Sequence, residues 1–163
     1  MINDMTIDAF GLPLLNTVMP FHEALDILIK LDAFPTGRVG ELQATNLTGI
    51  PLTPKNQPNY DMVNGIELKN SLLVKTAARP IAYFSKTRKS APIAATVLNH
   101  VSNITHYFWI EHKDYNILKG NTIAIPFHTN GAPKRFSRGR QNPWWTFEVT
   151  KDEYKKLITE HKV

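Results

Sequence analysis

The chain has 163 residues, of which 42% are hydrophobic and 20% are charged, and it carries a formal net charge of +5. This size and balance predict one globular domain over residues 1–163 and argue against a disordered chain. Cysteine is absent, which excludes a disulfide framework, a zinc–cysteine site and a thiol nucleophile.

The first part of the chain favours helices. Residues 1–19 are expected to form a loosely helical N-terminal arm. Apolar residues that recur about every 3.6 positions predict a helix over residues 21–34, which Pro35 would end. Thr36 is a suitable cap for a second short helix that reaches about Thr45.

Beyond a proline-containing loop the chain favours strands, with one helix among them and one at the end. The final helix is signalled by a capping box, in which Thr150 is followed three residues later by Glu153. This order predicts an α/β, mixed α+β fold with a central mixed β-sheet flanked by helices. Strands are expected at residues 66–74, 81–84, 106–112, 122–127 and 144–149, and helices at residues 92–101 and 150–161.

Residues 58–70 combine a turn with a strand that carries an acid and a base. The dipeptide Asn64-Gly65 is a strong hairpin signal, because both residues tolerate positive φ. Side chains alternate across the strand that follows, so Glu67 and Lys69 share one of its faces. The sequence therefore predicts that this acid and this base project together.

Asp61 brings a second carboxylate toward this strand from the other side of the turn. Two carboxylates and the backbone carbonyl of Leu68 are oxygen ligands of the kind that Mg²⁺ takes, and Mn²⁺ is expected to substitute. A bound ion of this kind lowers the pKa of its water, and Lys69 would orient that water for attack on a phosphate. The alternative interpretation is that Glu67 and Lys69 are an ordinary pair on a solvent-facing strand.

A larger pattern includes this stretch and an earlier glycine-containing segment. Its parts are Gly37-Arg38-Val39-Gly40-Glu41-Leu42, Asn59-Tyr60-Asp61 and Gly65-Ile66-Glu67-Leu68-Lys69. The pattern covers about residues 36–75 and resembles the PD-(D/E)XK nuclease superfamily. Within that superfamily it is similar to MutH-like nicking enzymes and to type II restriction endonucleases of PvuII-like size.

The resemblance implies a restriction-endonuclease-like fold and a Mg²⁺-dependent, sequence-specific DNA endonuclease. It implies that Asp61, Glu67 and the Leu68 carbonyl bind the metal and that Lys69 positions water. Members of this group often have a further acid on a helix, whose position falls near Ala44 here. Glu41 and Gln43 are the nearby substitutes, and Glu41 is expected to steer a second metal ion or its water.

Positive charge gathers in the middle of the chain. Residues 75–140 carry eleven Lys and Arg side chains against two acids, whereas residues 1–74 carry four against eight. A basic block suits a phosphodiester substrate, and a solvated basic surface is the plain alternative. The residues expected to contact DNA lie near residue 88 and in the loop at residues 128–143: Lys86, Arg88, Lys89, His128, Lys134, Arg135, Arg138, Arg140, Gln141 and Asn142.

Double-stranded DNA is thus the expected partner, with a homodimer expected if both strands are cut. A MutH-like nicking monomer, a non-catalytic DNA-binding module and an RNA-binding domain with base-stacking aromatic strands are the alternatives. The chain has no Walker-type phosphate loop, so no nucleotide cofactor is expected. It has neither a run of about 18 apolar residues nor a leader, which predicts a cytoplasmic, nucleoid-associated protein without a membrane partner.

Overall fold

The computed structural model of the chain describes residues 5–7, 13–15, 27–28, 36–54, 60–74, 78–86, 90–117 and 120–163. The chain divides into two units, Met1–Phe34 and Pro35–Val163, where the sequence predicted a single domain. Among the described residues, no helix is long and apolar enough to cross a membrane.

The described part of the first unit is a short pair of strands. Strand β1 (Met5–Ile7) pairs antiparallel with β2 (Pro13–Leu15), so the loosely helical arm expected at residues 1–19 is wrong for these segments. Pro13 is compatible with this pairing because it is the first residue of its strand. Of the helix expected at residues 21–34, only residues 27–28 are described, and both are helical.

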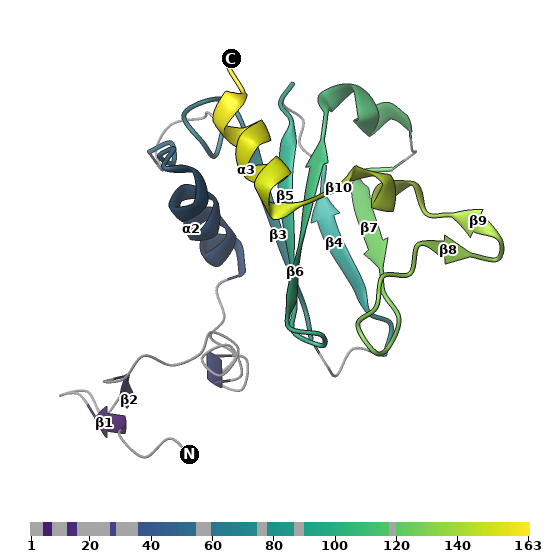
Figure 1. Cartoon of the computed structure of the whole chain (residues 1–163), viewed down its shortest axis with the longest axis horizontal. Helices are drawn as coiled ribbons and strands as arrows, with labels where there is room; N and C mark the ends of the chain where they lie inside the picture. Colours follow the sequence, from purple (N-terminus) through teal and green to yellow (C-terminus); the bar gives the residue numbers. More distant parts are fainter. Residues whose placement is uncertain are drawn as a thin grey trace. The chain divides into compact units, whose positions relative to one another are not determined.

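The second unit has three layers, and its fold is the mixed α+β class that the sequence predicted. A four-stranded mixed sheet is covered by two helices on one face and by two further strands on the other (Figure 1). The sheet has the order β10 (Glu148–Val149), β6 (Ile104–Ile110), β5 (Ile93–Asn99) and β3 (Glu67–Leu73). The covering elements are α2 (Thr36–Thr48), α3 (Lys151–Glu160), β4 (Ile81–Ser85) and β7 (Thr122–Pro126).

Each face of the four-stranded sheet has its own apolar core. On the side of β4 and β7 the core includes Leu73, Ile93, Ala95, Val97, Phe108, Ile125 and Trp145. On the helical side the core includes Ala44, Met62, Ile66, Leu68, Ala94, Tyr154 and Ile158. Residues of β3 and β5 therefore alternate between the two cores, which fixes the face toward which each side chain points.

Strand β5 replaces the helix that the sequence predicted over residues 92–101, so that prediction is wrong. The strand is central, lies parallel to β3 and antiparallel to β6, and is buried along its whole length. A strand that is buried on both faces carries an uninterrupted apolar run, and such a run also matches helical spacing. Ile93 and Val97 fit either pattern, and only the tertiary position of the segment separates the two.

The strand expected over residues 144–149 is also mostly wrong. The short 3₁₀ helix η2 occupies Pro143–Phe147, and only Glu148 and Val149 form a strand. Asn142 caps this helix by accepting a hydrogen bond from the Trp144 backbone N–H at 3.0 Å. Trp144 and Trp145 are consecutive, and both are buried. In a strand with one buried and one exposed face, only one of two consecutive side chains would be buried.

The final helix α3 begins as the sequence predicted. The Thr150 hydroxyl accepts a hydrogen bond from the Glu153 backbone N–H, and the Glu153 carboxylate accepts one from the Thr150 backbone N–H at 2.8 Å. Tyr154 and Ile158, four residues apart, pack onto the sheet. The capping box therefore sets where the chain leaves β10 and turns back over the helical face.

Helix α2 approaches β3 closely at a glycine. A Cβ atom built on Gly40 would lie 1.6 Å from the Asn70 side-chain oxygen, and Gly40 is buried. That oxygen also accepts a hydrogen bond from the Thr96 hydroxyl, so Asn70 cannot turn away without losing a bond. Gly40 is therefore required for the contact between this helix and the strand of the candidate site.

Gly40→Ala is expected to be less stable than Gly37→Ala by about 1–3 kcal/mol, the usual cost of overpacking. The gain in helix propensity is about 1 kcal/mol at an interior position such as Gly40 and smaller at Gly37 in the first turn of α2, and a Cβ at Gly37 meets nothing within 4 Å. The free energy of unfolding of both variants in urea measures the difference. Equal stabilities would contradict the close approach of α2 and β3.

Candidate active site and basic hairpin

The turn before β3 is built as the sequence predicted, with one difference. Met62 donates its backbone N–H to the Ile66 carbonyl at 3.1 Å, and Gly65 donates to the Met62 carbonyl at 3.0 Å. Of the Asn64-Gly65 pair only Gly65 adopts positive φ, at 86°. Asn64 has another use in the turn, because its side chain bonds to the end of a helix.

The C-terminal end of α3 holds this turn in place. The Asn64 side-chain amide donates to the Ile158 carbonyl at 2.8 Å and to the His161 carbonyl at 3.4 Å. These carbonyls lie at a helix end, where the chain itself supplies no partner. A Cβ on Gly65 would lie 2.6 Å from the Val163 side chain, so the C-terminal residues also cover the turn.

Asp61 is fixed to the free edge of β3. Glu67 donates its N–H toward β5, to the Pro92 carbonyl at 3.1 Å, so the polar groups of Leu68 point to the opposite edge, where β3 has no strand partner among the described residues. There the Leu68 N–H donates to the Asp61 carboxylate at 2.7 Å. The Leu68 carbonyl points to the same edge, because the N–H and C=O of one strand residue share a direction.

Glu67 and Lys69 lie beside this edge and contact each other, as predicted. The Lys69 Nζ atom is 3.1 Å from Glu67 Oε1, and Lys69 keeps 25% of its side chain exposed while Glu67 keeps 9%. Leu68 and Asn70 face α2, so Glu67 and Lys69 occupy the other face of the strand. We call the group of Asp61, Glu67, the Leu68 carbonyl and Lys69 the acidic edge.

Glu41 is not brought to the acidic edge. Its carboxylate accepts from the Arg38 guanidinium at 2.8 Å within α2, on an exposed part of the helix. Helix α2 covers the face of β3 opposite to that of Glu67 and Lys69. The structure therefore bonds Asp61 to Leu68 and pairs Lys69 with Glu67 on the neighbouring residues of β3, and it gives Glu41 a local partner.

The acidic edge has the chemistry of a hard-cation site. Its donors are two carboxylates and one backbone carbonyl, all oxygen, which is the donor type that Mg²⁺ takes together with waters. An ionised carboxylate has several lone pairs, so the bond from Leu68 is compatible with a cation on the Asp61 carboxylate. No cluster of three or more His, Asp or Glu side chains suited to a metal occurs among the described residues.

The loop expected at residues 128–143 contains a β-hairpin that sequence reasoning missed. Strands β8 (Phe136–Ser137) and β9 (Arg140–Gln141) pair antiparallel, and Asn142 N–H donates to the Arg135 carbonyl at 2.7 Å. Figure 1 shows these strands extending away from the layers of the unit. We call residues 135–142 the basic hairpin.

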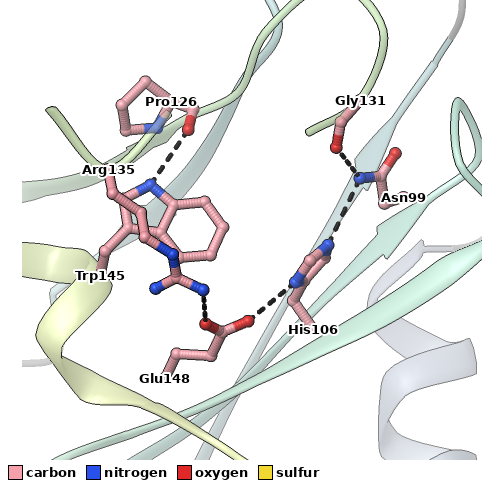
Figure 2. A network of polar contacts seen from close by, with 7 residues as sticks. All are labelled: Asn99, His106, Pro126, Gly131, Arg135, Trp145 and Glu148. Carbon is pink, nitrogen blue, oxygen red and sulfur yellow. Dashed lines mark hydrogen bonds and ion pairs between the residues drawn. The ribbon is translucent and has the colours of Figure 1, made fainter. Parts of the chain in front are cut away.

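Arg135 anchors the basic hairpin to the sheet. Its guanidinium forms an ion pair with Glu148 and lies 4.8 Å from the Trp145 ring centroid (Figure 2). Trp145 is itself fixed, because its indole N–H donates to the Pro126 carbonyl at 3.1 Å. The arginine that was expected to contact DNA is therefore held against the protein, although 45% of its side chain is exposed.

Glu148 extends this anchor into a buried network. Its second oxygen bonds to His106 Nδ1 at 2.9 Å, and the Asn99 side-chain amide contacts His106 Nε2 at 3.4 Å and donates to the Gly131 carbonyl at 2.7 Å. Because the Asn99 amide is a donor, its contact with His106 Nε2 is a hydrogen bond in the tautomer that carries the ring proton on Nδ1. His106 is 8% exposed.

The hydrogen bonds of this network affect the pKa of the Glu148 carboxyl. Burial alone would raise that pKa, but the hydrogen bonds from His106 and Arg135 outweigh it. The net result is a pKa below the ordinary value of 4.5. The ionised form of Glu148 is therefore the form that the fold stabilises.

The other predicted DNA contacts divide into two groups. Lys86 lies 5.5 Å from the Trp144 ring centroid, and Asn142 caps η2, so both have contacts within the protein. Arg138, Arg140 and Gln141 are exposed on the hairpin. Arg88 and Lys89 lie outside the described residues.

A basic depression lies where β4 and β7 meet the segment that leads to the hairpin. Its volume is about 340 Å³, and its lining includes His128, Lys134 and Arg79. Sequence reasoning placed His128 and Lys134 among the DNA contacts but missed Arg79. The available signal was the position of Arg79 within the basic block, directly before Pro80.

No protein-family model, curated protein or solved structure matches this chain. The resemblance to the PD-(D/E)XK superfamily rests on the motif residues of the chain itself.

Glu148→Gln is expected to flatten the pH dependence of stability. Because the folded-state pKa of Glu148 is lowered, the stability it contributes is complete above the ordinary value of 4.5 and is lost as the pH falls through the folded-state pKa. Wild type should therefore be the more stable protein near neutral pH and approach the variant in acid. Urea denaturation from about pH 7 to about pH 3 measures this.

The matched control is Glu160→Gln, which removes an exposed carboxylate at the end of α3. It should follow the wild-type curve. If Glu148→Gln also follows the wild-type curve, the ion pair with Arg135 does not anchor the hairpin.

Proposed function

We propose that this protein is a Mg²⁺-dependent, sequence-specific DNA endonuclease of the type II restriction kind. The observation that carries the proposal is the hydrogen bond from Leu68 N–H to the Asp61 carboxylate at 2.7 Å. It places one carboxylate at the strand residue that separates Glu67 from Lys69. Asp61 and three consecutive residues of β3 thus supply two acids, a carbonyl and a lysine, the kinds of group that a metal-dependent phosphodiester hydrolase uses.

The residues of the acidic edge have separate tasks in this proposal. Asp61, Glu67 and the Leu68 carbonyl would hold the cation, and Mn²⁺ would be accepted in its place. When bound, the ion supplies Lewis-acid stabilisation of the phosphate and a water of lowered pKa. Lys69, which already contacts Glu67, would orient the attacking water and stabilise negative charge on the phosphate oxygens.

The distribution of charge supports DNA as the substrate. Residues 75–140 carry most of the positive charge, and the basic hairpin and the basic depression concentrate it on described surface. Cationic side chains of this kind bind phosphates by releasing counterions from the duplex. Cleavage of both strands would require two copies of the site and therefore a homodimer, whereas a monomer would nick.

A DNA-binding module without catalysis is the second candidate. It is favoured by the absence of a third acidic or histidine ligand among the described residues near Asp61 and Glu67. In this case the hairpin binds DNA and the Glu67–Lys69 pair is structural. Tight DNA binding without any Mg²⁺-dependent cleavage would support it.

Lys69→Ala is expected to lower the rate of plasmid cleavage by about a hundredfold or more, because a group that stabilises transition-state charge is lost. The assay is conversion of supercoiled plasmid in Mg²⁺, with EDTA as the metal-free comparison. The control is Lys156→Ala, which removes an exposed lysine of α3. A Lys69→Ala enzyme that cuts like the control would show that Lys69 is an ordinary surface lysine.

Asp61→Asn is expected to abolish metal binding while the fold is retained. The amide oxygen of asparagine still accepts the bond from Leu68 N–H, but the charge that attracts a cation is gone. Calorimetric titration with Mn²⁺ measures the loss, and thermal unfolding without metal measures the fold. Unchanged Mn²⁺ affinity in this variant would contradict the assignment of Asp61 as a metal ligand.

A further inference from the structure

We infer that the basic hairpin enters the major groove of duplex DNA and that Arg138, at its tip, is the residue that inserts furthest. The inference rests on the proposed DNA substrate and names the element that recognises it. Arg140 and Gln141 flank the tip on β9 and would contact the groove beside it. The argument begins with the conformation of the turn.

The tip of the hairpin holds an arginine where the backbone favours other residues. Arg138 has φ of 50° and Gly139 has φ of 74°, and the two form the loop between β8 and β9. Two consecutive residues with positive φ define a type I′ turn, for which Asn-Gly is the preferred sequence. Arginine in the first position costs conformational free energy that asparagine would avoid. Stability therefore does not explain Arg138, and a contact made by its guanidinium does.

The two faces of the hairpin present different chemistry. Phe136 pairs with Gln141, and Ser137 pairs with Arg140, so each pair lies on its own face. Phe136 is 62% exposed, which is unusual for so large an apolar side chain. A ribbon with a guanidinium at the tip, an amide and a ring on one face and a second guanidinium on the other carries the donors that read base edges.

The base of the hairpin is anchored to the protein, so the residues expected to contact DNA bases are those nearer its tip. Arg135 is paired with Glu148 and stacked on Trp145, and Asn142 caps η2 (Figure 2). These residues hold the hairpin in its extended position and do not reach its tip. A rigid base reduces the conformational entropy that the hairpin loses on binding.

Charge complementarity identifies the partner as a polyanion. The sequence has no Asp or Glu between Asp114 and Glu148, and among the described residues the acid that pairs with the hairpin is Glu148, at its base. The major groove of B-form DNA admits a two-stranded β-ribbon, whereas the deep, narrow major groove of duplex RNA does not. A groove-reading ribbon therefore commits the partner to duplex DNA.

Arg138→Asn tests this inference, because it separates stability from binding. It creates the preferred turn sequence, so the melting temperature should stay the same or rise. Affinity for the tightest-binding 20-base-pair duplex selected from a random-sequence pool should fall at least about fivefold, since a base contact is lost. Binding is measured by fluorescence anisotropy in EDTA at several salt concentrations. Arg138→Gly is the second variant, with the same expected result.

Two further variants separate the kinds of contact. Lys156→Ala removes one positive charge elsewhere and should bind like wild type. Arg138→Lys keeps the charge but loses the planar fork of the guanidinium. If Arg138 contacts a base, this variant should bind DNA more weakly; if it contacts a phosphate, its affinity should not change. Wild-type affinity in both Arg138→Asn and Arg138→Gly overturns the inference. An equal loss on a duplex RNA of the same sequence also overturns it, in favour of a contact with phosphates alone.

The proposed function can survive the failure of this inference. If Arg138→Asn binds DNA normally while Asp61→Asn abolishes Mg²⁺-dependent plasmid cleavage, the nuclease stands and recognition lies outside the hairpin. If Arg138→Asn loses affinity and neither the wild type nor any variant cuts plasmid, the inference about the hairpin is supported and the protein is a DNA-binding module.

Discussion

In the part of the chain that the structure describes, strand β3 has a hydrogen-bonded neighbour on one side only, and this constraint determines where the acidic edge lies. In the four-stranded sheet it pairs with β5, so the N–H and C=O groups of alternate residues point away from the sheet. An unpaired strand edge must be protected or put to use. Here Asp61 takes the Leu68 N–H, and the Leu68 carbonyl beside it remains directed to the same edge. The proposed metal site thus depends on the strand being at an edge.

Sequence reasoning located the acidic edge because its signals are local. The turn dipeptide, the alternation that joins Glu67 to Lys69, and the position of Asp61 seven residues before Leu68 all depend on short-range geometry. The capping box of α3 was visible for the same reason. The helix predicted at residues 92–101 was wrong because burial on both faces of β5 depends on elements distant in sequence. No local pattern carries that information.

In the basic segment, too, the sequence alone did not show which role each residue has. Composition alone treats its arginines and lysines as one cationic surface, but the structure gives them different tasks. Arg135 pairs with Glu148, thirteen residues later, and Lys86 lies over Trp144, so part of the charge stabilises the fold. Arg138 and Arg140 remain on the exposed hairpin. These different tasks were not predicted because the hairpin was not predicted. Its Arg138-Gly139 turn lacks the asparagine that usually signals a type I′ turn.

The C-terminal segment from residue 148 onward connects the two candidate functional regions. At its start Glu148 holds Arg135 and thereby the base of the basic hairpin. At its end the carbonyls of Ile158 and His161 bind Asn64 in the turn that follows Asp61. Between them the Thr150–Glu153 capping box and the buried Tyr154 fix α3 on the sheet. Since one helix with its flanking strand positions both regions, the geometry of each depends on the same packing of α3 against the sheet.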